Sequence, residues 1–433
     1  MPEETKTGLV RVIGRWTLVG LVLNSAIGSG IFGLPSLVSE HVGRAAPLAY
    51  LVAAVGVAVI MACFAEVGSQ FREAGGPYLY TREAFGRFAG IQIAWVTWLV
   101  RLTGAAANTN LFATYLAEFW PSAARGVPRL LVMTMLLAVP LAINYRGVKS
   151  GARMSNMFII AKLMPLTLAA ILGLIFIRGG LAAMPLHSHE VFASSSLGSW
   201  MDAILVLVFA YGGFEVGLFP MGEAKNPRRD VPFALLVGFA VMLVLYTLIQ
   251  IGVQAGLAAP ELSKRPLAAA AGILAGRWAA VFIAIGALVS IYGYLGAMML
   301  NVPRLTFALA ERKDFPSFFA WIHPRFRTPY LSVLIFGVLV WALALAGSFE
   351  WNLTLSAVAR LLTYGATCAA LIPLRKKTPE VSALRLPAGK WVAIAGVIFS
   401  VTIATRMDRT ALAIVAVTLL IALGNWALVR ERT

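Results

Sequence analysis

Twelve apolar segments follow one another along this sequence and leave little room for anything else. The hydrocarbon core of a bilayer is about 30 Å thick, so a helix needs roughly 20 apolar residues to cross it. Charged residues make up only 13% of the 433 positions, too few to cover a soluble domain of this size. We therefore expect an all-α integral membrane protein with twelve transmembrane helices. The segments cover residues 16–37, 46–68, 88–119, 127–145, 154–177, 198–221, 231–257, 278–310, 329–347, 351–373, 390–405 and 410–429.

The distribution of lysine and arginine predicts the orientation. Of the 36 basic residues, 24 lie in or beside the two chain ends and the even-numbered loops, and nine lie in the odd-numbered loops. Basic residues accumulate on the cytoplasmic side of a membrane. We expect both termini in the cytoplasm and a multi-pass protein in the lipid bilayer of the cell's inner (plasma) membrane. Because the net charge of +17 is spread between apolar spans, it indicates topology signals and argues against a nucleic-acid partner.

Two of the apolar segments contain residues that interrupt a helix. The first segment has Gly-Ser-Gly at 28–30, and the sixth has Gly-Gly at 212–213. Each glycine costs up to about 1 kcal/mol in a helix interior. Unwound backbone at membrane depth is tolerated only where it faces protein or a water-filled cavity. Taken singly, either cluster is equally well explained by close packing of helices at small residues.

The two interruptions occupy corresponding places, in the first segments of two five-segment halves. Because each half has an odd number of spans, the second half is inserted upside down relative to the first. Interrupted helices that are paired in inverted repeats indicate the binding site of a transporter. Free amides at a half-helix N-terminus bind a carboxylate, and free carbonyls bind an ammonium group. Such a site recognises both charges of a zwitterion.

Four motifs resemble those of the amino acid–polyamine–organocation (APC) superfamily, and residues 209–213 are further similar to its L-type amino acid transporter branch. The resemblance implies the LeuT fold, a 5+5 inverted repeat in which helices 1 and 6 are broken, followed by two extra C-terminal helices. The motifs are Gly28 to Phe32, Gly75 to Tyr78 with Phe85-Gly86, Gly222 to Pro227 with Pro232, and Pro303-Arg304 through Phe315-Pro316.

The same resemblance divides the chain into parts. The core of the chain carries the transport function, and the charge bias described above places both ends in the cytoplasm. The expected parts are a cytoplasmic N-terminus at 1–15, a transport core at 16–373 with repeats at about 16–177 and 198–373, two additional transmembrane helices at 374–429, and a cytoplasmic C-terminus at 430–433.

Carried over residue by residue, the resemblance implies a substrate site at the two breaks. Ser29 and Gly30, next to Gly28, bind the substrate carboxylate in this reading. Main-chain carbonyls bind its amine, and Phe209 covers it as a gate, unless that ring is an ordinary packing aromatic. The carbonyls belong to Ala26, Ile27, Phe209, Ala210 and Gly212.

A lysine deep in the fifth segment points to the coupling mode. Charges within a span are costly, so a functional role is the default. In similar superfamily members, a lysine here takes the place that sodium fills in sodium-coupled relatives. Lys162 is therefore expected to bridge segments one and five, near the carbonyls of Gly20 to Leu23, and to make transport sodium-independent. Exchange and proton coupling both stay open.

Other polar residues in the spans have open alternatives. Glu215 contacts a cationic substrate, carries a proton, or forms a structural pair with Arg101. Asn108 lines the pocket or satisfies a helix contact. Arg101 and Arg360 receive no role from the resemblance.

Three loop residues have simpler expectations. Glu223 is either solvated or closes an inner gate. His187 and His189 lack the company of further ligands, so no metal site is expected there.

The loop between segments three and four lacks the cysteine through which L-type relatives join a partner glycoprotein. No disulfide-linked heavy chain is therefore expected. A stand-alone prokaryotic transporter that works as a monomer fits better.

The sequence thus predicts a secondary active transporter that moves amino acids by alternating access and needs no cofactor. Small residues at Ala26, Gly212 and Gly213 leave room for an apolar side chain of medium to large size, so neutral L-amino acids are the expected substrates. A polyamine or cationic amino acid permease is the first alternative, which Glu215 keeps open. An integral-membrane enzyme is disfavoured because no nucleophile–base or metal-ligand cluster is visible. A channel is disfavoured because no filter motif is visible.

Overall fold

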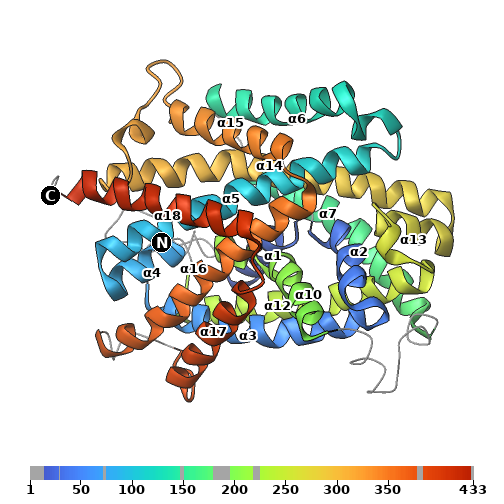
Figure 1. Cartoon of the computed structure of the whole chain (residues 1–433), viewed down its shortest axis with the longest axis horizontal. Helices are drawn as coiled ribbons and strands as arrows, with labels where there is room; N and C mark the ends of the chain where they lie inside the picture. The colour runs from blue at the N-terminus through green and yellow to red at the C-terminus, as the bar shows by residue number, and fades with distance from the viewer. Residues whose placement is uncertain are drawn as a thin grey trace.

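The computed structural model describes residues 14–28, 30–71, 75–146, 151–178, 196–217, 225–377 and 384–430, without the side chains of 151–161, 227 and 228. Within these ranges every regular element is a helix, as the sequence predicts (Figure 1). Four long helices run side by side across the molecule: α5 (Arg87–Leu116), α14 (Arg277–Glu311), α15 (Tyr330–Ala346) and α6 (Gly126–Arg146). The first half contains α1 (Arg15–Ala26), α2 (Gly30–Val42), η1 (Gly43–Ala45), α3 (Ala46–Gln70), α4 (Gly76–Phe85), α5 (Arg87–Leu116), η2 (Pro121–Ala124), α6 (Gly126–Arg146) and α7 (Gly151–Ile175).

The second half follows the same succession of long helices. One short helix precedes its third long helix, as α4 precedes α5 in the first half. The elements are α10 (Leu197–Tyr211), α11 (Phe214–Gly217), α12 (Pro227–Gly256), η4 (Pro260–Leu262), α13 (Pro266–Ala275), α14 (Arg277–Glu311), η5 (Ser317–Ala320), α15 (Tyr330–Ala346), α16 (Phe349–Lys377), α17 (Gly389–Ala404) and α18 (Arg409–Val429).

Each of the twelve predicted segments coincides with helix. The first and sixth are each divided in two, α1 from α2 and α10 from α11, at the predicted interruptions. In the described part of the chain, seven helical stretches are long and apolar enough to cross a membrane. The chain is therefore a multi-pass membrane protein.

Apolar side chains cover much of the outer surface. On α18, Leu412, Leu420 and Leu428 are all exposed. An outer surface with many exposed apolar side chains is unfavourable in water but matches the hydrocarbon of a bilayer. The outer helix therefore presents the face that a lipid-embedded protein needs.

One type of turn, a corner between a short helix and a long helix, occurs once in each half of the chain. The ten-residue helices α4 and α13 end at Gly86 and Gly276, where the long helices α5 and α14 begin. The two glycines have φ of 94° and 88° and ψ of 174° and 175°. Because this positive φ strains any residue with a Cβ, both corners need glycine. Each glycine is followed by an arginine and an aromatic residue that begin the long helix.

Candidate functional site

The first break is a short non-helical joint. The amide of Ile27 still donates to the Leu23 carbonyl (2.8 Å), but that of Gly28 donates to the Ala26 carbonyl (2.9 Å), which departs from helical hydrogen bonding. α2 starts anew at Gly30, so its first-turn amides have no partner within the helix. Ser29 lies outside the described residues, and its predicted contact with a carboxylate stays a prediction.

The second break lies between α10 and α11 at Gly212 and Gly213. Gly213 has a φ of 103°, which favours glycine. Its amide donates to Oε2 of Glu215 (2.9 Å), so this side chain folds back and caps the break. The glycine pair that the sequence marks is therefore a turn in the structure.

The two breaks touch each other. A Cβ on Gly213 would lie 2.5 Å from the Ser25 carbonyl oxygen, and one on Gly30 would lie 3.3 Å from the Phe209 ring. These approaches bring α1 beside α11 and α2 beside α10. The residues predicted to form a site from segments one and six are thus neighbours in space.

Lys162 on α7 binds the backbone of the first break. Its Nζ donates to the carbonyls of Asn24 (3.0 Å) and Ile27 (3.2 Å), and the side chain is buried. The predicted bridge between segments one and five is present, but its acceptors are not the predicted carbonyls of residues 20–23. They lie later because helix α1 continues to Ala26, and carbonyls lose their helical partners only at its end. Ile27 keeps a second lone pair for a ligand.

Glu215 belongs to a buried ion pair. Its Oε1 accepts from Nη2 of Arg101 on α5 (3.0 Å), and its Oε2 accepts from the Tyr364 hydroxyl on α16 (2.8 Å). The structural pairing with Arg101 that the sequence left open is therefore present. Together with the Gly213 amide, these contacts occupy both carboxylate oxygens.

Arg360 on α16 reaches the second break from the opposite side. Its Cζ lies 5.7 Å from the centre of the Phe209 ring, and a Cβ on Gly212 would lie 1.7 Å from its Nη1. Its Nε and Nη1 are buried without a hydrogen-bond partner among the described residues. The space beside Gly212 that the sequence left for a substrate side chain is therefore occupied by a guanidinium group.

Tyr294 on α14 lies between the first break and α5. A Cβ on Gly28 would lie 3.7 Å from its ring, and one on Gly104 would lie 3.2 Å from its hydroxyl. Asn108 donates to the Gly104 carbonyl (2.8 Å), whereas its Oδ1 is buried without a partner among the described residues. Asn108 thus satisfies a helix contact with one end of its amide.

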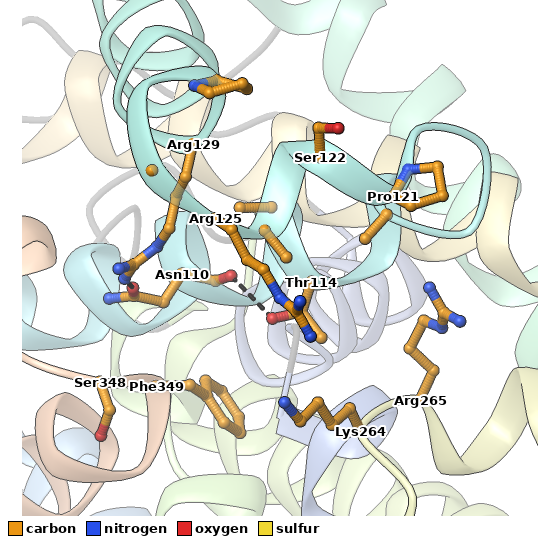
Figure 2. Close-up of a pocket in the computed structure, with 15 residues that line it drawn as sticks. Asn110, Thr114, Pro121, Ser122, Arg125, Arg129, Lys264, Arg265, Ser348 and Phe349 are labelled. Carbon is orange, nitrogen blue, oxygen red and sulfur yellow. Dashed lines mark hydrogen bonds between the residues drawn. The ribbon is translucent and has the colours of Figure 1, made fainter.

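A second feature is a cavity of about 870 Å³, bounded by the ends of α5, α6 and α16 and by the loop before α13. Figure 2 shows four basic side chains around it, and none of its fifteen lining residues is acidic. Phe349, at the start of α16, is part of its wall and packs against Gly33 of α2. We call this cavity the vestibule; its basic residues are Arg125, Arg129, Lys264 and Arg265.

Two further buried carboxylates lie away from the breaks. Asp314, just after α14, accepts from Arg82 (2.7 Å), from Arg87 (2.7 Å) and from the Tyr78 hydroxyl. Burial and the neighbouring carboxylate raise the pKa of Tyr78 to about 12, so it stays a donor at physiological pH. These contacts tie α4 and α5 to the end of α14.

The other is Glu66, near the end of α3. It accepts from Nε (2.6 Å) and Nη2 (2.5 Å) of Arg375 and from the Leu386 amide (2.9 Å). This forked pair fixes the end of α3 to the end of α16.

Sequence reasoning missed the roles of Tyr294, Tyr364 and Arg360. The first two have no local signal, because a tyrosine in an apolar span is most often a packing residue. Arg360 carried the general signal of an intramembrane charge, but its position against Gly212 depends on how α16 packs. Glu223, His187 and His189 lie outside the described residues.

Comparisons with known proteins cover most of the chain. A family model described as amino acid permease matches residues 13–422. The serine/threonine exchanger SteT of Bacillus subtilis is 30% identical over 75% of this chain and 74% of its own length. The arginine/agmatine antiporter of Chlamydia pneumoniae is 28% identical over 92% and 86%. A methylthioribose transporter of Bacillus subtilis is 26% identical over 89% and 86%. Relatives at similar distances thus carry chemically different substrates.

Proposed function

This chain belongs to the amino acid permease family of the APC superfamily, and we propose that it moves amino acids across the plasma membrane by alternating access. Its family and relatives are transporters, not enzymes. The observation that carries the proposal is the contact between the two helix breaks. Gly213 lies against the Ser25 backbone there, and Phe209 lies against Gly30.

The proposed architecture is the LeuT-type arrangement of twelve spanning helices, with both termini in the cytoplasm. The repeated Gly–Arg corner supports it, because the same turn precedes the third long helix of each half. The matching positions of the breaks, in α1–α2 and α10–α11, support it as well. The lysine and arginine bias supports the orientation. In this orientation the vestibule lies on the side of the membrane that faces away from the cytoplasm.

The proposed substrate site uses the backbone of both breaks. The free amides at the start of α2, with Ser29 and Gly30, bind the substrate carboxylate, and carbonyls of Ala26, Ile27, Phe209, Ala210 and Gly212 bind its amine. Phe209 covers the bound substrate, since its ring already lies against Gly30. Oriented backbone dipoles recognise a zwitterion without a full countercharge in the membrane.

Sodium independence rests on Lys162. Its ammonium binds carbonyls at the end of α1, which are the type of ligand that sodium prefers. Because the Lys162 ammonium already occupies these carbonyls, a sodium ion is not needed at this position. Transport therefore proceeds by exchange or proton coupling. We also propose that the protein works as a monomer.

A cationic substrate is less well supported. Glu215 kept that alternative open in the sequence, but both of its oxygens now have donors in Arg101, Tyr364 and Gly213. A polyamine or cationic amino acid would have to displace one of them.

Uptake into proteoliposomes tests the proposal. Purified protein is reconstituted with and without internal amino acids, sodium and a pH gradient, and labelled amino acids are added outside. We expect uptake that is unchanged when choline replaces sodium. Gly30→Leu should abolish it, because the side chain would enter the space of Phe209 and Leu34. The control is Gly20→Ala, whose Cβ meets nothing within 4 Å.

Sodium-dependent uptake would refute the role of Lys162. Full activity of Gly30→Leu would refute the site. If no amino acid crosses under any gradient, amino acid transport itself is refuted.

A further inference from the structure

The buried charges of the molecule are unevenly distributed. In the described part of the chain, the three buried acids are Glu66, Asp314 and Glu215, and only Glu215 lies at the helix breaks. The three buried cations among the same described residues all lie at the breaks; these are Arg101, Lys162 and Arg360. The site thus holds three positive charges and one negative charge.

The surplus is not spread evenly over the three cations. Arg101 has Glu215 as its partner, and Lys162 has two backbone carbonyls. Arg360 leaves Nε and Nη1 without a hydrogen-bond partner among the described residues, although the residue is only 4% exposed. Glu215 also interacts electrostatically with Arg360, so one negative charge is shared between two arginines, and Arg360 is the one whose N–H groups stay unfilled.

Arg360 cannot remove the surplus positive charge by losing a proton, because guanidinium stays charged in proteins. Burial of more positive than negative charge is costly, so such groups persist where they are used. The planar guanidinium matches a carboxylate, to which it donates two parallel hydrogen bonds. The chemistry that fits Arg360 is thus an anionic oxygen pair.

The position of Arg360 says which carboxylate this is. The substrate's own α-carboxylate is already assigned to the amides at the start of α2, beside Gly30. Arg360 lies at the other break, over Phe209 and against Gly212, where the side chain of the substrate was expected. A second carboxylate, at the end of the substrate side chain, meets the guanidinium there.

The vestibule provides an independent observation. Four cations line it, and one of them, Arg265, pairs with Glu118 at 3.0 Å. A cleft lined by one sign of charge raises the local concentration of ligands of the opposite sign. The helices α5 and α16 both lead from this cavity to the breaks, since α16 runs from Phe349 to Arg360 over about 16 Å at 1.5 Å per residue.

We propose that the transported amino acid has an acidic side chain, whose carboxylate binds Arg360 after the vestibule has attracted it. This inference rests on the proposed amino acid transport and narrows its substrate class. It replaces the neutral side chain that the sequence suggested, because the room beside Gly212 holds a cation.

The wild-type protein provides the first test. Proteoliposome uptake of L-aspartate and L-glutamate is compared with that of their near-isosteric amides, L-asparagine and L-glutamine, and with L-serine and L-arginine. We expect the acids to be preferred over the amides by roughly 100-fold in kcat/KM, because an unpaired charge is left when the amide binds. Equal use of acids and amides would overturn the inference. Uptake of serine or arginine alone would overturn it while leaving amino acid transport intact.

Arg360→Gln provides the second test. We expect the acid-to-amide ratio to collapse towards one, with partial recovery in Arg360→Lys. The matched control is Arg406→Gln, which removes an arginine from an exposed pair with Asp202 and should keep the wild-type ratio. An unchanged ratio in a monodisperse Arg360→Gln protein would overturn the role of Arg360.

A third variant leaves the buried cluster intact. Arg125→Gln combined with Arg129→Gln should raise KM for the acids several-fold at low salt, without affecting the amides, and should weaken the dependence on ionic strength. Equal changes in KM for acids and amides would refute attraction by the vestibule. This variant serves even if Arg360→Gln does not fold.

Discussion

Two fully buried carboxylates, Asp314 and Glu215, are each held by arginine, yet their surroundings differ. Asp314 is paired with Arg82 and Arg87, whose side chains remain 30% and 21% exposed. Glu215 is paired with Arg101, and both of these side chains are only 3% exposed. Both clusters have more arginines than acids. At Asp314 the surplus charge reaches water, whereas at Glu215 it stays inside the protein.

This difference separates a structural clamp from a site. A surplus cation that is partly hydrated costs little, so the Asp314 cluster is complete without a ligand. A surplus cation that is buried costs several kcal/mol and is kept where a ligand or a conformational change uses it. The two clusters should therefore respond in opposite ways to mutation. Loss of Asp314 should affect stability, and displacement of Arg360 should affect transport.

The largest effect is expected for Asp314→Asn. The change removes the buried carboxylate that accepts from Arg82, Arg87 and Tyr78, and each hydrogen bond to a charged group contributes about 1.5–3 kcal/mol. Thermal unfolding in detergent should show a strong loss of stability. A near-wild-type unfolding temperature would show that solvent already compensates these arginines.

Gly212→Ala should act on transport instead. The new Cβ would lie 1.7 Å from Nη1 of Arg360, so the guanidinium must move away from the break. We expect kcat/KM to fall roughly 100-fold with little loss of folded protein, because misplacement by about 1 Å has this effect at reactive or binding groups. Gly296→Ala, whose Cβ meets nothing within 4 Å, is the control. Equal activity of the two variants would contradict the position of Arg360.

Tyr364→Phe should have a smaller effect. It removes one of the hydrogen bonds to Glu215, and such bonds to charged groups contribute about 1.5–3 kcal/mol. Chemical or thermal unfolding should show the loss. Tyr80→Phe is the matched control, since the buried Tyr80 hydroxyl has no partner among the described residues. If the two variants unfold alike, the Tyr364 bond contributes nothing.

The smallest effect is expected for Asp202→Asn. Asp202 pairs with Arg406 (2.8 Å) at side-chain exposures of 27% and 38%, and such pairs contribute about 1 kcal/mol or less. The same substitution as in Asp314→Asn should hardly move the unfolding temperature. A loss comparable to that of Asp314→Asn would remove the distinction between exposed and buried pairs.

Much of the fold was predictable from the sequence because apolar length and glycine position are local signals. The twelve segments and both breaks follow from such signals, whereas the placement of Lys162 against the first break followed from the resemblance to the APC superfamily. The acceptors of Lys162 were predicted about one turn too early, because periodicity does not fix where a helix ends. The contact of Arg360 with Gly212 joins residues 148 positions apart, and only the packing of α16 brings them together. The pairing of Tyr364 with Glu215 depends on the same packing.

The corner that occurs at both Gly86 and Gly276 has a consequence for how the chain is oriented during insertion. In the proposed inverted repeat, the two copies face opposite sides of the membrane. The arginine that follows each glycine is then placed once with the charge bias and once against it. Arg277 therefore lies on the side of the membrane that the charge bias disfavours, directly after the glycine of its turn. The inverted repeat thus reduces the lysine and arginine bias that orients the chain in the membrane.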